Sequence, residues 1–149
     1  MAKLVEKLPL PDRRKEIVDD CGRLLDDEVR KKKGIGGMAV KAGYKVLKTF
    51  KPGAVPNLVD ALFDDFMEAL ERFHADYEGA GSAGSFGGYM RTRESEVAEA
   101  LVQVTDRRAE KTRHNSLRKW YKKLRGSAKR NVQEAVPGLG NLVDRYYQK

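Results

Sequence analysis

Apolar residues recur at steps of three and four along most of this sequence, which is the spacing of one face of an α-helix. The widest such stripe lies between residues 58 and 77, where acidic residues occupy the opposite positions. Its apolar members are Leu58, Val59, Leu62, Phe63, Phe66, Met67, Leu70, Phe73 and Tyr77. The pattern therefore predicts an amphipathic helix here, with its apolar face in the core.

Shorter stripes predict further helices on both sides of this one, each with a candidate capping residue or helix-ending residue. The predicted helices start at Asp12, at about Met38, near Pro56, after Thr92 or Ser95, and at Asn115 or Ser116, with a short closing helix that follows Pro137 and Gly138. No segment alternates apolar and polar residues for long enough to predict a strand. We expect an all-α fold, built as a single compact domain of five to seven helices over residues 1–149.

One phrase occurs twice in the chain. Residues 52–60 read Pro52-Gly53-Ala54-Val55-Pro56-Asn57-Leu58-Val59-Asp60, and residues 137–144 read Pro137-Gly138-Leu139-Gly140-Asn141-Leu142-Val143-Asp144. Because Pro and Gly end helices and Asn or Pro begins them, the phrase predicts a helix–turn–helix joint that is used twice. Residues 79–88 contain five glycines and predict a mobile linker. These features predict two related helical halves, about 12–78 and 92–147, joined by that linker.

The net charge of +8 at pH 7 comes almost entirely from one stretch. Residues 107–130 carry eleven Lys and Arg residues against the single acid Glu110, whereas residues 30–51 carry eight and no acid. Acidic residues gather in 16–28 and 60–78, so the basic block of the first half can pair with them inside the fold. The excess in 107–130 has no comparable acidic block, which favours a contact with an anionic partner.

The composition narrows the class of protein. No stretch approaches the roughly 18 consecutive apolar residues of a transmembrane helix. The first residues contain no apolar run followed by a cleavage site, so no signal peptide is expected. A lone cysteine, Cys21, cannot form an internal disulfide. We expect a cytoplasmic protein.

Candidate catalytic groups are few and far apart. His74 and His114 lack a nearby cysteine or an H-x-x-x-H spacing, which argues against a zinc site. Cys21 lies on a core stripe, and the Asp64-Asp65 pair occupies the solvent side of a helix. The glycines of 34–37 follow a lysine-rich helix end instead of a strand, so they lack the context of a dinucleotide-binding loop. We expect no enzyme, metal or cofactor, unless the fold gathers His74, Cys21 and the aspartates in one cleft.

Two rows of basic residues are the best candidates for a binding site. Lys and Arg at steps of three and four share one helix face, where they can follow the phosphates of a polyanion. The candidate residues are Lys41, Lys45, Lys48, Arg118, Lys122, Arg125 and Lys129. Trp120 and Tyr121 have core spacing, which argues against a role in base stacking.

Several partners fit these rows. The first is nucleic acid or another polyanion; the second is an acidic protein or a second copy of the chain, in a protein–protein module without a nucleic-acid role. An anionic membrane surface would need an exposed apolar face, which these helices commit to the core. The rows are also compatible with a solvated face that has no partner. Pairing of the rows with the acidic helices 16–28 and 60–78 would weaken the polyanion hypothesis.

Several motifs resemble those of a known family. They are Gly36-Gly37-Met38-Ala39-Val40-Lys41-Ala42-Gly43-Tyr44, Pro52-Gly53-Ala54-Val55-Pro56, Phe86-Gly87-Gly88-Tyr89, Val97-Ala98-Glu99-Ala100-Leu101, Val104-Thr105-Asp106-Arg107-Arg108, Arg118-Lys119-Trp120-Tyr121 and Leu124-Arg125-Gly126. In these motifs the chain resembles a family of small helical bacterial proteins catalogued only as a domain of unknown function. The resemblance spans about residues 15–145. It implies a stand-alone helical protein with no assigned activity, and it carries over no catalytic or binding residue.

Overall fold

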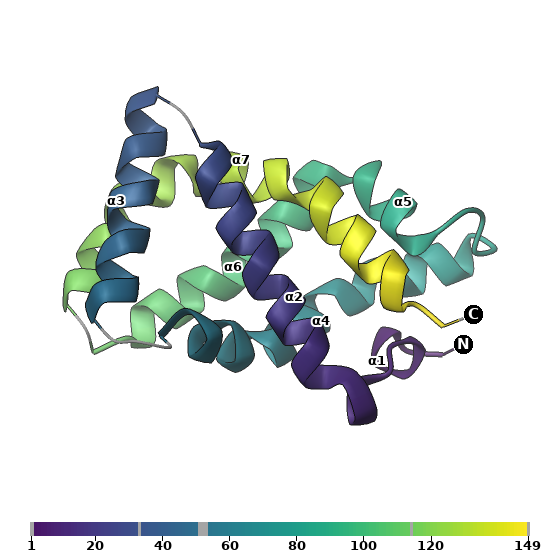
Figure 1. Ribbon diagram of the computed structural model, residues 1–149. Coiled ribbons are helices and arrows are strands. Elements are labelled where there is room, and N and C mark those ends of the chain that lie inside the picture. Colours follow the sequence, from purple (N-terminus) through teal and green to yellow (C-terminus); the bar gives the residue numbers. More distant parts are fainter. Residues whose placement is uncertain (1, 33, 51–53, 114, 149) are drawn as a thin grey trace.

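The computed structural model describes residues 2–32, 34–50, 54–113 and 115–148. Its helices are α1 (Leu4–Lys7), α2 (Leu10–Lys31), α3 (Gly34–Phe50), α4 (Ala54–Gly79), α5 (Phe86–Arg91), α6 (Glu94–Lys111) and α7 (Asn115–Tyr146) (Figure 1). These residues contain no strand, and the predicted all-α fold is confirmed. The backbone of α2 is not helical at Arg13, so the seven helices become eight if this break divides α2. Within the same residues no helix has the length and apolar character needed to cross a membrane.

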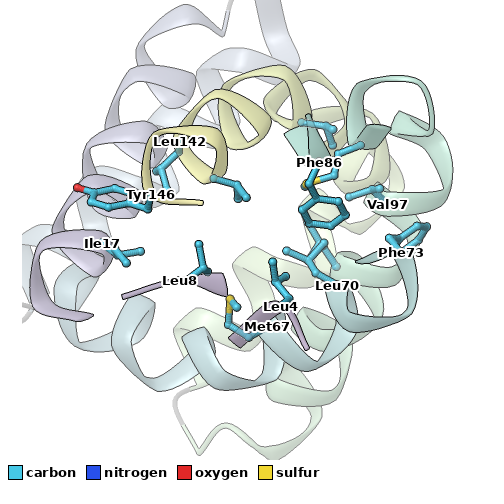
Figure 2. Close-up of a cluster of buried hydrophobic side chains, with 14 of the residues drawn as sticks. Leu4, Leu8, Ile17, Met67, Leu70, Phe73, Phe86, Val97, Leu142 and Tyr146 are labelled. Atoms are coloured by element: carbon cyan, nitrogen blue, oxygen red, sulfur yellow. The ribbon is translucent and has the colours of Figure 1, made fainter. Parts of the chain in front are cut away.

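The main core joins α4 to α1, α2, α5, α6 and the second half of α7 (Figure 2). The predicted stripe of α4 supplies much of it, since Leu62, Phe63, Met67, Leu70, Phe73 and Tyr77 are all buried. Leu4, Phe86 and Met90 enter from the short helices α1 and α5 and are fully enclosed, at 0% exposure. Complete burial of a large apolar side chain contributes roughly 1.5–3 kcal/mol, so these short helices are held by their core residues.

A second, smaller cluster packs α3 at the other end of the molecule. Val29 of α2 and Tyr44 of α3 form its buried centre, with Val40, Leu58 and Val59 against them. The chain turns from α2 into α3 at Gly34, whose φ of +77° favours glycine. A Cβ at Gly37 would lie 2.7 Å from the backbone carbon of Lys32, so this corner is tight.

The repeated phrase adopts two different structures, and the prediction of a second joint at 137–144 is wrong. α7 runs through this segment without ending, with Pro137 inside it. The glycines serve a helix crossing: a Cβ on Gly87 of α5 would lie 2.2 Å from the carbonyl oxygen of Gly140. At the first phrase α3 ends at Phe50 and α4 begins at Ala54, while 51–53 lie outside the described residues.

The glycine-rich segment 79–88 is only partly irregular, so the predicted linker is too long. α4 extends to Gly79, and α5 begins at Phe86. Ser85 caps α5 by accepting a hydrogen bond from the Gly88 N–H at 2.9 Å. The irregular part is therefore 80–85, where Gly81 and Gly84 have positive φ.

Three predicted helix starts also differ from the structure. α2 begins at Leu10 instead of following an Asp12 cap, and α3 begins at Gly34 instead of Met38. α6 begins at Glu94 after Arg93, with no side-chain cap from Thr92 or Ser95. Helix ends depend on the backbone at one or two residues, which periodicity does not specify.

We expect Gly87→Ala to lower the free energy of unfolding by about 1–3 kcal/mol, because the new methyl group would overlap the Gly140 carbonyl and force α5 from α7. Gly126→Ala in α7 is the control, since a Cβ there meets nothing within 4 Å. The free energy of unfolding of this control should be unchanged or higher, because alanine has a higher helix propensity than glycine. Urea unfolding measures both changes, and equal stability of the two variants would contradict a close crossing.

Candidate polyanion-binding surface

The basic segments of the sequence meet at one end of the molecule. α3, the C-terminal end of α6 and the first half of α7 gather there, away from both chain termini (Figure 1). α3 packs against α7, and α6 packs against α7. The two predicted basic rows therefore lie on helices in contact with each other.

A short connection between α6 and α7 builds the turn at this end. α6 buries Val97, Ala98, Leu101, Val102 and Val104. It ends at Lys111, and the N–H of the next residue, Thr112, donates to the carbonyl of Ala109. α7 begins at Asn115. Since the two helices pack side by side, the basic residues on both sides of the turn lie near one another.

Tyr121 ties α7 to α6 beside this turn. Its hydroxyl donates to a carboxylate oxygen of Asp106 at 2.5 Å and lies 2.9 Å from the Thr105 hydroxyl. Burial and the bond to Asp106 raise the pKa of Tyr121 to about 12, so the phenol stays protonated. Tyr121 thus has an internal role, in agreement with its predicted core spacing.

Acidic side chains pair with three of the seven predicted cations. Arg125 Nε lies 2.8 Å from Asp106, and Lys129 Nζ lies 3.6 Å from Glu99. Lys48 Nζ lies 3.7 Å from Asp26 and 5.1 Å from the centre of the Tyr44 ring. These pairs hold α7 on α6 and α3 on α2, so the three side chains have structural partners.

The remaining predicted cations are exposed. Arg118 donates to the carbonyl of Thr112 and so braces the turn between α6 and α7. Lys45 lies on the surface of α3. Lys41 and Lys122 are exposed, and neither forms an ion pair with any residue the structure describes.

More exposed cations surround the α6–α7 turn than the predicted rows contained. We call this group the basic corner; its members are Arg107, Arg108, Lys111, Arg113, Arg118, Lys119, Lys122 and Lys123. All eight are exposed, and none forms a side-chain ion pair within the described part of the chain. The corner therefore presents a dense positive charge to solvent.

The sequence rows missed six of these eight residues. The rows were chosen by spacing on one helix face, and that criterion selected Arg125 and Lys129, which lie on the side that meets α6. The better signal was the concentration of charge in 107–130. Of its eleven cations, Arg125 and Lys129 pair with acids of α6 and Arg130 pairs with Glu134, while the other eight form no ion pair within the described part of the chain.

A cavity elsewhere in the molecule is a weaker candidate for an anion site, because its cations are paired. A 370 Å³ cavity between α2, α3 and α7 contains Lys31, Lys32 and Arg130, but each is paired with a carboxylate of the same cavity. The closest pair joins Lys32 Nζ to Glu134 at 2.5 Å, and this bond lowers the pKa of Glu134.

The groups considered for catalysis do not converge. Cys21 packs against the main core, and burial raises the pKa of its thiol to about 11. Asp64 is exposed and binds Arg14 at 2.8 Å. His74 is fully buried in the core. No group of three metal-binding side chains occurs among the described residues.

Comparison with known proteins places the chain in a family. The model of the Family of unknown function (DUF6918) matches residues 4–147, and the chain belongs to this family, which confirms the resemblance. An argininosuccinate lyase of Pyrobaculum islandicum (strain DSM 4184 / JCM 9189 / GEO3) is 31% identical over 100 residues. That match covers 67% of this chain, which spans only 23% of the lyase. No solved structure matches the chain.

We expect Tyr121→Phe to lower the free energy of unfolding by about 1 kcal/mol, because it removes the hydroxyl that joins Asp106 and Thr105. Tyr89→Phe is the matched control: Tyr89 is also half-buried, and its hydroxyl forms no hydrogen bond with a described residue. Thermal unfolding followed by circular dichroism measures the difference. An equal loss in both variants would show that the hydroxyl of Tyr121 does not join the two helices.

Proposed function

We propose that this DUF6918 protein is a non-enzymatic cytoplasmic protein that binds nucleic acid or a similar polyanion through the basic corner. The observation that carries the proposal is the set of eight exposed cations around the α6–α7 turn, which form no ion pairs within the described part of the chain. Cations held close together release the counterions of a phosphate backbone when they bind it, and this release drives association. Lys41 and Lys45 of α3 extend the same end of the molecule.

The distribution of apolar surface favours a polyanion over a protein partner. Among the side chains that the structure describes, the large apolar ones that are exposed are Val5, Leu25 and Met38, which lie on three different helices. A stable protein–protein interface needs a contiguous apolar centre, which these scattered side chains do not provide. Association with an acidic protein or with a second copy is the alternative, and it would use the same cations.

Helices from both predicted halves share the main core, which supports the proposal that residues 1–149 act as one domain. The match to argininosuccinate lyase adds no activity, because the chain corresponds to less than a quarter of that enzyme. No lyase reaction is proposed for this protein.

We expect the protein to bind a fluorescent 20-base-pair DNA duplex at low salt, with an affinity that falls steeply as salt rises. For a duplex, log Kd changes with log salt by about 0.9 for each phosphate neutralised. Anisotropy titrations between about 25 and 200 mM salt measure this slope. Absence of binding at the lowest salt concentration, or an affinity that does not depend on salt, would contradict the proposal. A sedimentation mass above that of the monomer together with no DNA binding would support the alternative.

We expect the triple variant Lys119→Gln, Lys122→Gln, Lys123→Gln to bind the duplex at least about tenfold more weakly and with a salt slope lower by up to about three. The control, Lys15→Gln, Arg23→Gln, Arg145→Gln, removes the same charge from α2 and the end of α7, where the three side chains are 91%, 69% and 63% exposed. Its affinity should change little. Equal weakening by both triples would show that net charge, and not the basic corner, controls binding.

A further inference from the structure

The two ends of the chain are held on α4 by one set of polar contacts, which we call the terminal clasp. The N–H of Leu4 donates to both carboxylate oxygens of Glu71, at 3.0 Å each. The N–H of Gln148 donates to the carbonyl of Lys7 at 2.7 Å. The Tyr147 hydroxyl lies 2.8 Å from Nε2 of His74. The N-terminal segment thus contacts both α4 and the C-terminal residues, beside the marked chain ends in Figure 1.

His74 lies at the centre of the clasp and is completely enclosed, at 0% exposure. The ring of Phe86 packs edge-on against it at 5.1 Å, and the rings of Tyr77 and Tyr147 lie at 6.1 and 5.7 Å. Glu78 approaches Nε2 at 3.2 Å, and Glu71 lies 3.8 Å from Nδ1 on the other side of the ring. Lys7 of α1 lies over the Tyr147 ring at 6.0 Å.

Two buried polar atoms of this group have no hydrogen-bond partner among the described residues: Nδ1 of His74 and Oε1 of Glu78. Buried polar groups without a partner are rare in folded proteins, so this pair calls for a physical reason. Glu71 could accept a bond from Nδ1, but its oxygens already accept the N–H of Leu4.

The surroundings favour the neutral ring. Burial has the largest effect and lowers the pKa of His74; Glu78 and Glu71 act in the opposite direction, and Lys7 lowers it further. The net result is a pKa below the ordinary histidine value. The neutral imidazole carries one proton, and protonation would make both ring nitrogens donors.

We propose that His74 makes the terminal clasp acid-sensitive, so that protonation of its ring releases residues 4–8 and 147–148 from α4. If the added proton enters at Nε2, that atom becomes a donor, so the Tyr147 hydroxyl must turn from donor to acceptor to keep its contact. If it enters at Nδ1, the new N–H competes with Leu4 for Glu71. Wherever the proton enters, it changes the donor pattern at a contact that holds one end of the chain, and it places a positive charge in an enclosed site. The N–H···O bond from Gln148 to Lys7 joins that end to the other.

The direction of the pH effect follows from linkage. A buried base with a lowered pKa binds fewer protons in the closed state than in the open state, where its pKa is about 6.5. The clasp is therefore fully stable above that value and loses stability as pH falls from about 6.5 toward the lower pKa of the closed state. One pH unit below the open-state value, the open population can rise by up to about tenfold.

Hydrogen exchange of the full-length protein tests this proposal. We expect amides of 4–8 and 143–148 to exchange severalfold faster at pH 5.5 than at pH 7.5, after correction for the intrinsic rate, while amides of α6 change little. In His74→Gln, which offers an amide donor and acceptor but does not titrate, this difference should disappear. Equal exchange at both pH values in the wild type, or an undiminished difference in His74→Gln, would overturn the proposal.

A second pair of measurements keeps the test decisive if His74→Gln does not fold. The NMR titration of the wild-type ring should show a midpoint below 6.5, and a midpoint at or above this value would overturn the proposal. Glu78→Gln removes a charge that favours the protonated ring and so lowers the pKa of the closed state further; opening in this variant should continue to lower pH and reach a larger extent than in the wild type. Unchanged opening in Glu78→Gln would also contradict the role of His74.

Discussion

The close crossing of α5 and α7 is the constraint on which most of the structure depends. The two backbones approach at Gly87 and Gly140, where a side chain on either residue would overlap the opposite carbonyl. Asp144 of α7 reinforces the crossing by accepting hydrogen bonds from the Gly87 N–H and the Ser85 hydroxyl, both at 2.8 Å. Because α5 is fixed in this way, Phe86 enters the main core, and α7 must continue past Pro137 as one helix.

The length of α7 then determines where the charge lies. Its 32 residues span roughly 48 Å at 1.5 Å per residue, so it reaches from the main core to the basic corner. α6 packs along its first half and offers Asp106 and Glu99, which pair with Arg125 and Lys129. The eight cations of the basic corner stay in water, where screening keeps the repulsion between neighbouring charges small. The fold can therefore carry a surplus of positive charge without a large loss of stability.

Much of the fold could be predicted because periodicity reports burial directly. The stripe between Leu58 and Tyr77 identified α4, and its deepest residues are those at the core. α5 was not predicted, because six residues are too few to show a helical period and its glycines are typical of a linker. Pro137 and Gly138 have the pattern of a helix end. Gly140, which follows them, instead allows a close contact with Gly87 of α5. A local pattern cannot distinguish a glycine that makes a turn from one that allows a close approach.

The candidate binding surface, like the fold, could be predicted from the sequence only in part. The concentration of basic residues in 107–130 was visible in the sequence, and the structure places those residues around one turn. The choice among them was not visible, because the pattern of a helix gives its buried face but not the neighbour beside its charged faces. Arg125 satisfies the spacing of a binding row, yet it lies opposite Asp106 at 2.8 Å. Arg108 fits no row, and it is exposed without an ion pair among the described residues.

We expect the two ends of the molecule to respond to different solution conditions, because one carries exposed charges and the other a buried histidine. The cations of the basic corner are exposed lysines and arginines, whose charge is constant near neutral pH but is screened by salt. His74 lies at the end that holds the chain termini, enclosed by aromatic rings and two glutamates. Its burial limits screening by salt, and protonation would place a charge inside the core. α7 runs from one end to the other, and its second half packs with α4 in the main core. Because ionic strength screens the exposed charges and pH sets the protonation of the buried ring, we expect salt to act on the proposed binding surface and pH on the proposed terminal clasp, each without the other.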